Sequence, residues 1–180
     1  MNAVIQHELA LLRTLHEQKD VPFRGNQPAT EDEIRAAGQQ IHFDIENGLR
    51  DLWLLCNGAD YWMTFFGVFS DEPTPCRFLS VAEAVQRWQE FQGSIRDYEQ
   101  DSPRDPRIRG GWSHPRWLPF AEFNGFSTCV MYDRAPNDGG TDGQIIVYQH
   151  DPDAIYWVAR NFEEFFQQSN RIIEENDLIE

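Results

Sequence analysis

The stretch Trp117–Tyr132, with the sequence WLPFAEFNGFSTCVMY, decides the fold class. It contains two short apolar runs rich in aromatic and β-branched residues, which predict strands around Trp117–Ala121 and Ser127–Tyr132. Further runs of the same kind predict strands around Gln144–Gln149 and Ala154–Ala159. Successive strands with helical patterns before and after them are typical of an α+β fold with a mostly antiparallel sheet.

Helical patterns lie before these strands. The apolar face of the first expected helix consists of Val4, Ile5, Leu11, Leu12 and Leu15. A capping box formed by Thr30 and Glu33 predicts the start of a second helix, because each side chain can bond a free backbone N–H. A third helix is expected to end at Asn57-Gly58. Its buried stripe is expected to contain Ile45, Leu49, Leu52, Trp53 and Cys56.

The middle and the end of the chain continue the pattern. Residues 61–69 (YWMTFFGVF) and 76–79 (CRFL) predict two short strands. A second capping box, Ser80 and Glu83, opens a helix with an inward face of Val81, Val85, Trp88 and Ile95. Residues 97–115 predict a long loop. Asn161 caps a last helix with an inner face of Phe162, Phe165, Phe166 and Ile173 and an outer face of Glu163, Glu164, Glu174 and Glu175.

The composition predicts a folded domain that needs no disulfide, metal or cofactor. The 180 residues are 41% apolar and 13% aromatic, enough to bury a sizeable core. Cys56, Cys76 and Cys129 form no C-x-x-C pair, so we expect buried, reduced thiols. The N-terminus lacks the pattern of a signal peptide, and no apolar run approaches the ~20 residues needed to cross a bilayer. A cytoplasmic protein is expected.

The formal charge of −15 limits the partners that the protein can bind. A field of this sign repels nucleic acid and anionic lipid and attracts basic proteins. The only basic island combines four arginines with two tryptophans: Arg104, Arg107, Arg109, Arg116, Trp112 and Trp117. Four arginines are a weak match for nucleic acid in so acidic a chain, so we interpret them as salt-bridge partners beside buried tryptophans.

The acidic, glycine-rich segment Tyr132–Asp151 could be a metal loop, a phosphate cradle or a turn. An EF-hand loop that starts at Asp138 would place Gly140 at position 3 and Gln149 at position 12. These positions need an oxygen ligand and a bidentate acid, so the segment lacks two calcium ligands. A phosphate loop would need a lysine after its glycines and a helix behind it, and the segment offers neither. The remaining interpretation is a surface hairpin in which Gly139, Gly140 and Gly143 supply positive φ angles.

No residue pattern indicates catalysis, so a non-enzymatic protein is expected. The sequence GFSTC around Ser127 lacks the second glycine and the helix of a nucleophile elbow. Cys129 lies within an apolar strand, which is a poor setting for a reactive thiolate. His150 and Asp151 could form an acid–base couple, but a turn before Pro152 is the simpler interpretation.

The order of these motifs resembles the SUKH superfamily, which contains the fungal cell-wall assembly regulator and many bacterial toxin-immunity proteins. The segments LSVAEA, WLPFAEFNGFSTCVMYD, GQIIVYQHD and VARNFEEFF carry the resemblance, which covers about Thr30–Phe166. The signature positions are Trp117, Pro119, Gly125, Asp133, Gly143 and His150. We expect a single domain over residues 1–180, with a helix and linker in 1–29, the core in 30–166 and an acidic helix end in 167–180.

The resemblance implies a binding protein without catalytic residues, most often an antidote that covers a secreted toxin such as a nuclease. Because such a toxin is basic, an acidic inhibitor can be steered onto it. The expected contact residues are Asp138, Asp142, Asp151, Asp153, Tyr156, Glu163 and Glu164. An exposed Tyr156 or Trp62 would supply the energetic anchor.

Two other functions stay open at this point. A housekeeping scaffold or regulator of the same fold would bind several intracellular proteins. A small-ligand module or hydrolase would use a groove near Trp117, His114 and His150. The sequence does not specify the oligomeric state.

Overall fold

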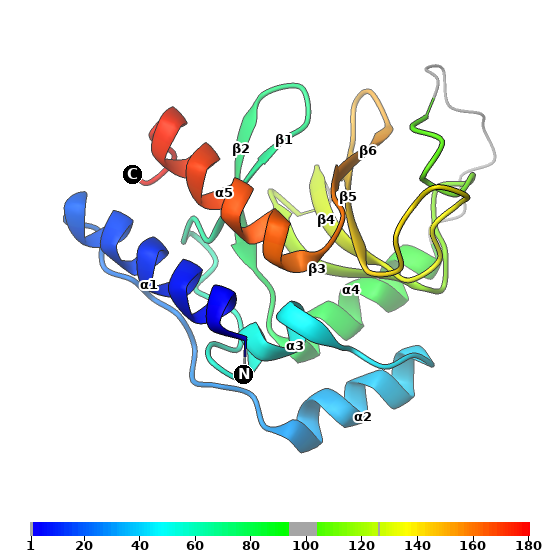
Figure 1. Cartoon of the computed structure of the whole chain (residues 1–180), viewed down its shortest axis with the longest axis horizontal. Helices are drawn as coiled ribbons and strands as arrows, with labels where there is room; N and C mark the ends of the chain where they lie inside the picture. The colour runs from blue at the N-terminus through cyan, green and yellow to red at the C-terminus, as the bar shows by residue number, and fades with distance from the viewer. Residues whose placement is uncertain (1, 94–103, 126) are drawn as a thin grey trace.

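A computed structural model describes residues 2–93, 104–125 and 127–180. The expected inward residue Ile95 and residues 97–103 of the expected loop lie outside these ranges. The helices are α1 (Ala3–Gln18), α2 (Glu31–Ile41), α3 (Asn47–Trp53), α4 (Val81–Gly93) and α5 (Phe162–Asn176) (Figure 1). The strands are β1 (Phe66–Phe69), β2 (Pro73–Phe78), β3 (Trp117–Phe123), β4 (Thr128–Asp133), β5 (Gln144–Gln149) and β6 (Ala154–Ala159).

The strands form one six-stranded sheet in the order β1-β2-β3-β4-β5-β6, so every strand pairs with its neighbours in the chain. All of these pairs are antiparallel. Helix α4 interrupts the meander between β2 and β3, and α5 follows the last strand. The predicted α+β fold, with N-terminal helices, an antiparallel sheet and a closing helix, is confirmed (Figure 1).

Both faces of the central strands are buried, in two separate clusters. On β4, Val130 belongs to the large cluster beside α1, α3 and α5, whereas Met131 belongs to a second, smaller cluster. Ile108 and Trp112, from the segment before β3, close the second cluster. This arrangement explains why all six residues of β4 are buried without any alternation of polar side chains.

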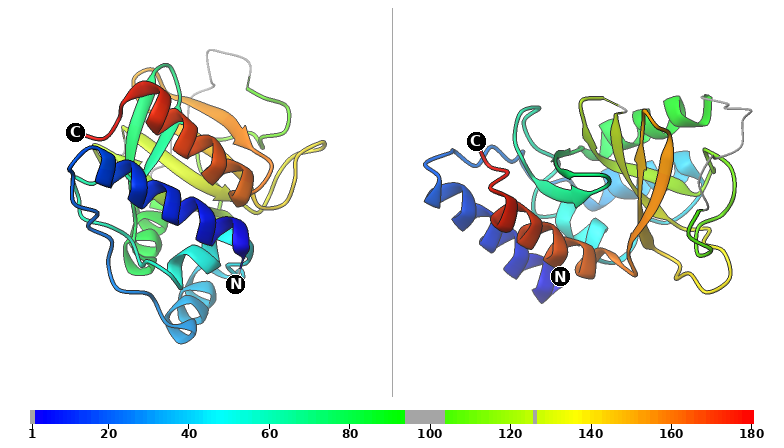
Figure 2. Two further views of the ribbon diagram at one scale, coloured as in Figure 1. Left: turned by 60° about the vertical axis from the view of Figure 1, so that its left-hand side comes forward. Right: turned by 90° about the horizontal axis from the view of Figure 1, so that it is seen from above.

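Helices α1 and α5 run side by side and in the same direction (Figure 2). Near their N-terminal ends, the Asn2 side chain donates to Oε1 of Glu163 at 2.6 Å. Near their C-terminal ends, Lys19 forms an ion pair with Asp177. The two helices are therefore joined at both ends, by Asn2 and Glu163 at the start and by Lys19 and Asp177 at the finish.

The predicted starts of three helices are confirmed. At α2, the Thr30 N–H donates to Glu33 at 2.7 Å and the Glu33 N–H donates to the Thr30 hydroxyl at 3.2 Å. At α4, the Ser80 N–H donates to Glu83 at 2.8 Å. At α5, the Asn161 side chain accepts a backbone hydrogen bond from the third residue of the helix at 2.8 Å. These local signals depend only on neighbouring residues, so the sequence reveals them directly.

The buried face of α1 differs from the prediction. Leu11 is 36% exposed, whereas Leu9 and Glu8 are buried. Leu9 lies four residues after Ile5 and therefore shares its face. Burial of Glu8 is possible because the Asn170 side chain donates to its carboxylate at 2.8 Å. A partner that is distant in sequence thus permits a charged residue on the inner face.

Helix α3 is shorter than predicted. It ends at Trp53, whose carbonyl accepts a hydrogen bond from the Ala29 N–H at 2.9 Å. The expected stripe residues Ile45 and Cys56 are buried but lie outside the helix. The apolar spacing correctly indicated which residues are buried. The helix is shorter because the carbonyl of its last residue, Trp53, bonds the linker before α2 and not a following turn of helix.

The sheet curls until the tip of the β1–β2 hairpin reaches β5 and β6. The Asp71 carboxylate accepts hydrogen bonds from Gln149 at 2.6 Å and from the Tyr156 hydroxyl at 3.0 Å. Helix α5 lies along β1, and the Ser169 hydroxyl accepts a hydrogen bond from the Gly67 N–H at 2.9 Å. The helix thereby covers a backbone donor on an edge strand.

Gly67 is required for this close approach, and Gly67→Ala is expected to lower the free energy of unfolding by about 1–3 kcal/mol. A Cβ atom at this position would lie 3.0 Å from side-chain carbons of both Ile172 and Ile173. Urea denaturation would measure the change. Gly110→Ala is the control, because a Cβ atom there would meet no atom within 4 Å. Equal effects of the two substitutions would contradict this account of the β1–α5 contact.

Candidate functional site

The signature residues Trp117 and Asp133 meet in a buried polar cluster. The fully buried Asp133 carboxylate accepts hydrogen bonds from the Trp117 indole at 2.9 Å, the Ala135 N–H at 2.8 Å and the Gln144 side chain at 2.8 Å. Burial raises the pKa of Asp133 above its ordinary value, although these three hydrogen bonds oppose the shift. The cluster ties β3, β4 and β5 together.

The other signature positions are also elements of the scaffold. Pro119 lies in β3 next to a β-bulge. Gly125 and Gly143 have φ angles of 67° and 85°, a region that disfavours other residues. His150 is exposed at the end of β5, and its Nδ1 lies 2.7 Å from the Asp153 carboxylate. The pairing of His150 is therefore with Asp153 and not with the adjacent acid of the HD motif.

The loop between β4 and β5 is a surface connection, as expected, with one correction. Gly139 and Gly143 have positive φ angles, whereas Gly140 does not. A Cβ atom at Gly140 would lie 2.7 Å from Cβ of Pro136 and 2.9 Å from the Arg107 carbonyl oxygen. Gly140 is thus required by the lack of space and not by its backbone angle.

The basic island folds over the second cluster of the sheet. Arg107 pairs with Asp105 at 2.7 Å, and its guanidinium lies 3.5 Å from the centre of the Trp157 ring. Trp112 and Trp117 are buried, as the sequence predicted. Arg107 thus forms an ion pair and a ring contact, whereas Arg104 and Arg109 donate hydrogen bonds to backbone carbonyls.

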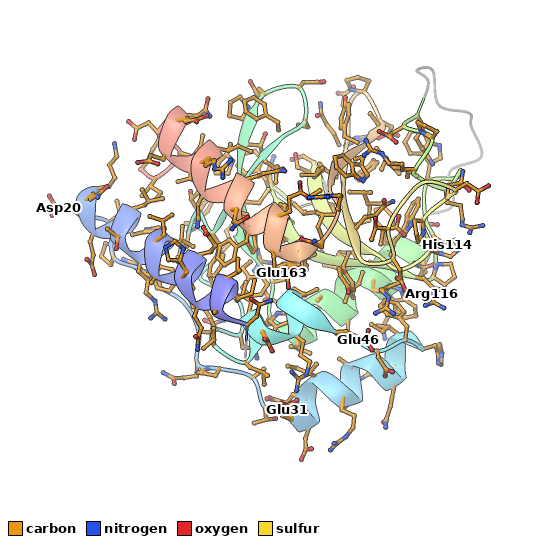
Figure 3. The ribbon with its side chains drawn as sticks, in the orientation of Figure 1. Asp20, Glu31, Glu46, His114, Arg116 and Glu163 are labelled. Atoms are coloured by element: carbon orange, nitrogen blue, oxygen red, sulfur yellow. The ribbon has the colours of Figure 1, made fainter. Side chains whose placement is uncertain are left out.

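The burial of Trp117 argues against the groove considered near Trp117, His114 and His150. Trp117 is 0% exposed, so its ring is not available to line a groove. Burial lowers the pKa of His114, and the neighbouring Arg109 lowers it further. His114 is therefore a weak base on the surface of the basic island, beside Arg116 (Figure 3).

A buried carboxylate joins β2, β3 and α4. Glu122 is 1% exposed and accepts hydrogen bonds from Arg77 at 2.8 Å and from Arg87 at 2.7 Å. Burial alone would lower the pKa of Arg77, but the hydrogen bonds to Glu83 and Glu122 raise it above the ordinary value. The hydrogen bond to Glu122 likewise raises the pKa of Arg87. No local pattern in the sequence signals this network.

Most of the expected contact residues have partners within the protein. Asp138 and Asp151 are exposed, whereas Glu163 and Glu164, expected in solvent, are half-buried. The internal pairs are Asp142 with Arg134, Asp153 with His150, Tyr156 with Asp71, Glu163 with Asn2 and Glu164 with Arg160. Several of these side chains therefore have a structural role as well as a surface position.

Three acids from separate segments lie around the start of α3, and two of them share one arginine partner. Arg134 lies 2.7 Å from Asp142 and 3.2 Å from Glu46, and both acids are more than half exposed. A Cβ atom on Gly48, in the first turn of α3, would lie 3.2 Å from the Glu163 carboxyl carbon. Glu46 and Glu163 are labelled in Figure 3. We call Glu46, Asp142 and Glu163 the acidic patch.

A second surface feature is an aromatic hollow beside β2 and β3. The strand predicted from Tyr61 begins instead at Phe66, and residues 61–64 form a turn and coil outside the sheet. Tyr61, Trp62 and Phe123 line the hollow, and they are 48%, 88% and 43% exposed. Aromatic composition predicted a strand here, but the segment lies outside the sheet and leaves these rings exposed.

The thiols of the described chain are buried, and its possible metal ligands are dispersed. All three cysteines are buried thiols, and burial raises the pKa of Cys129, which keeps it protonated. Within residues 2–93, 104–125 and 127–180, no three His, Cys, Asp or Glu side chains are grouped as metal ligands. No helix in these ranges is long and apolar enough to cross a membrane.

Comparisons with known proteins identify one matching family and two similar fungal proteins. Residues 28–168 match the SMI1 / KNR4 family (SUKH-1). KNR4/SMI1 homolog 1 of Debaryomyces hansenii is 33% identical over 87 residues, which are 47% of this chain and 19% of that protein. The glucan synthesis regulatory protein of Neurospora crassa is 33% identical over 86 residues, 48% of this chain and 16% of that protein. The chain therefore spans less than a fifth of the length of these relatives.

Proposed function

The chain belongs to the SMI1/KNR4 family (SUKH-1), and from this premise we propose that it is a protein-binding domain that neutralises a bacterial toxin by covering it. The observation that carries the proposal is the position of Glu46, Asp142 and Glu163 around the start of α3, where Arg134 pairs with the first two. An acidic surface on a chain of charge −15 suits a basic partner, such as a nuclease that must hold nucleic acid.

The partner would be recognised by carboxylates whose positions are fixed before binding. Arg134, which is only 13% exposed, holds Glu46 and Asp142, so these carboxylates lose little conformational freedom on binding. The local excess of acids over bases would accelerate the encounter, because opposite fields steer two proteins together. The proposal requires no bond-making group on this chain.

Co-expression tests the function directly. The product of the gene adjacent to this one should be toxic when expressed alone, and co-expression of this protein should restore growth and yield a stable complex. Absence of toxicity, or absence of protection, would refute the toxin-neutralising function for this protein.

Neutralising the two acids of the acidic patch that pair with Arg134 is expected to slow association with that toxin. Glu46→Gln with Asp142→Asn should lower the association rate about 3- to 10-fold at low ionic strength and leave the dissociation rate nearly unchanged. Stopped-flow mixing at several salt concentrations measures both rates. Glu17→Gln with Glu175→Gln changes the net charge equally at exposed positions on α1 and α5 and is the control. Equal rates for the two double variants would exclude the acidic patch as the steering surface.

A regulator of endogenous proteins is the second candidate function. The name of the Neurospora crassa relative, a glucan synthesis regulatory protein, favours it. Affinity purification distinguishes the two functions: several endogenous partners and no adjacent toxin would favour the regulator.

A further inference from the structure

Trp62 is exposed to an unusual degree. It is 88% exposed, more than any other large hydrophobic residue exposed in the described ranges. Its ring meets Tyr61 edge to face at 4.8 Å, and the Arg77 guanidinium lies 5.1 Å from the centre of the Tyr61 ring. The Tyr61 ring thus contacts both Trp62 and Arg77, and both rings remain exposed. Exposed, positioned aromatic side chains are typical anchors of protein interfaces.

Three hollows follow one another from this point. The first lies between the turn at residues 61–64 and the strands β2 and β3. The second shares Trp62 and Met63 with the first and extends to the linker after α1. The third shares Ile179 with the second and lies between the ends of α1 and α5. The three hollows therefore adjoin one another through shared lining residues and form a series from Phe123 to the C-terminal ends of both helices. Asp20, just after α1, is labelled in Figure 3.

The charge along this surface changes from neutral to acidic. Arg77 at the first hollow pairs with Glu83 at 2.7 Å and with Glu122 at 2.8 Å. In the second and third hollows, Arg24 pairs with Asp60 at 3.4 Å and Lys19 pairs with Asp177. The remaining acids that line these two hollows are Glu174 and Glu180. Arg24 and Lys19 are each paired with an acid, and Glu174 and Glu180 leave the net charge of these two hollows negative.

We propose that this surface binds an extended segment of a partner protein that carries apolar anchor residues beside arginine or lysine. The apolar side chains would enter the first hollow against Trp62, and the basic side chains would lie along the acids of the second and third hollows. Charge complementarity selects this occupant, since an acidic or purely polar segment would meet like charge or leave the rings uncovered.

This surface is separate from the acidic patch. Glu163 lies at the N-terminal end of α5, whereas Glu174 lies near its C-terminal end, and the parallel α1 has 16 residues. At 1.5 Å per residue, the 11 positions from Glu163 to Glu174 correspond to about 16 Å along α5, between the acidic patch and the third hollow. The inference therefore goes beyond the proposed function, and each can fail without the other.

Short peptides provide the test. The probe is an acetylated and amidated hexapeptide, Arg-Arg-Leu-Leu-Arg-Arg, titrated into 15N-labelled protein and followed by NMR. We expect a dissociation constant of about 0.1–1 mM, as for a small ligand with few anchors, and shifts in the Trp62 indole signal. The control peptides are Glu-Glu-Leu-Leu-Glu-Glu and Arg-Arg-Ser-Ser-Arg-Arg, which lack the charge or the anchor and should bind at least about tenfold more weakly.

Substitutions test whether Trp62 and the acids of the second hollow bind the peptide. Trp62→Ala should weaken the first peptide at least about fivefold and change the free energy of unfolding by no more than about 0.5 kcal/mol, because the side chain is exposed. Asp60→Asn with Glu180→Gln should weaken it about two- to fivefold and reduce its salt dependence. Phe69→Ala, which removes an aromatic residue that is 49% exposed elsewhere, should have no effect.

Several results would overturn the proposal. These are no binding at about 5 mM peptide, equal binding of either control peptide, and unchanged binding to Trp62→Ala. Light scattering tests a further outcome. If the wild-type protein is a dimer and Trp62→Ala is a monomer, then the surface binds a second copy of this chain and not a basic segment of another protein.

Discussion

Glu122→Ala is expected to lower the free energy of unfolding by about 3–5 kcal/mol. The Glu122 carboxylate is 1% exposed and lies between the guanidinium groups of Arg77 and Arg87, at 2.8 and 2.7 Å. Removal of the acid leaves two partly buried cations without their shared partner, and this desolvation cost exceeds the loss of an exposed ion pair. Urea denaturation followed by far-ultraviolet circular dichroism measures the difference.

Glu90→Ala is the matched control for this substitution. Glu90 also pairs with Arg87, at 2.7 Å, but its side chain is 39% exposed. Solvent screens such a pair, so its removal should cost no more than about 1 kcal/mol. If Glu122→Ala and Glu90→Ala destabilise the protein equally, then the buried position of Glu122 does not determine its contribution.

The strand region could be predicted because its signals are local and continuous. The expected ranges Gln144–Gln149 and Ala154–Ala159 coincide with β5 and β6. Both faces of the central strands are buried, so the apolar runs are uninterrupted and their ends are sharp. The caps at Thr30 and Ser80 are predictable for the same reason, since each depends on residues within one turn.

The two surfaces could be predicted only in part. The sequence indicated acidic segments, but the meeting of Glu46 and Asp142 depends on Arg134, which lies 88 residues after Glu46. The position of Glu122 within an apolar strand gave no sign of its arginine partners, which lie 45 and 35 residues away. Trp62 belongs to an aromatic run that favours a strand, and only the three-dimensional arrangement leaves it exposed.

Asp133→Ala is expected to lower the free energy of unfolding by about 3–5 kcal/mol. The substitution removes the acceptor of the Trp117 indole, the Ala135 N–H and the Gln144 side chain in a site that is fully buried. Each donor left without a partner costs about 1–3 kcal/mol, and partial relaxation reduces the sum. Loss of near-ultraviolet circular dichroism from the Trp117 environment should accompany the change. A loss no larger than that of an exposed substitution would contradict the role assigned to the cluster.

Asp133→Asn tests the same cluster through its pH dependence. An amide nitrogen would face the Gln144 amide nitrogen, and Gln144 cannot rotate freely because its oxygen accepts from Trp157 at 3.2 Å. Because burial raises the pKa of Asp133, the folded protein binds this proton at a higher pH than the unfolded chain does. The advantage of wild type over Asp133→Asn should therefore grow as the pH falls from 7 to about 4.

Glu83→Gln should show the opposite trend, which makes it the control for the sign. The side-chain hydrogen bond from Arg77 and those from Ser80 outweigh burial, and they lower the pKa of Glu83 below its ordinary value. The stability that the Glu83 carboxylate contributes is present above its ordinary pKa and is lost as the pH falls through the lowered value. The advantage of wild type over Glu83→Gln should therefore shrink over the range in which the advantage over Asp133→Asn grows. Parallel trends for the two variants would mean that burial does not control the ionisation of Asp133.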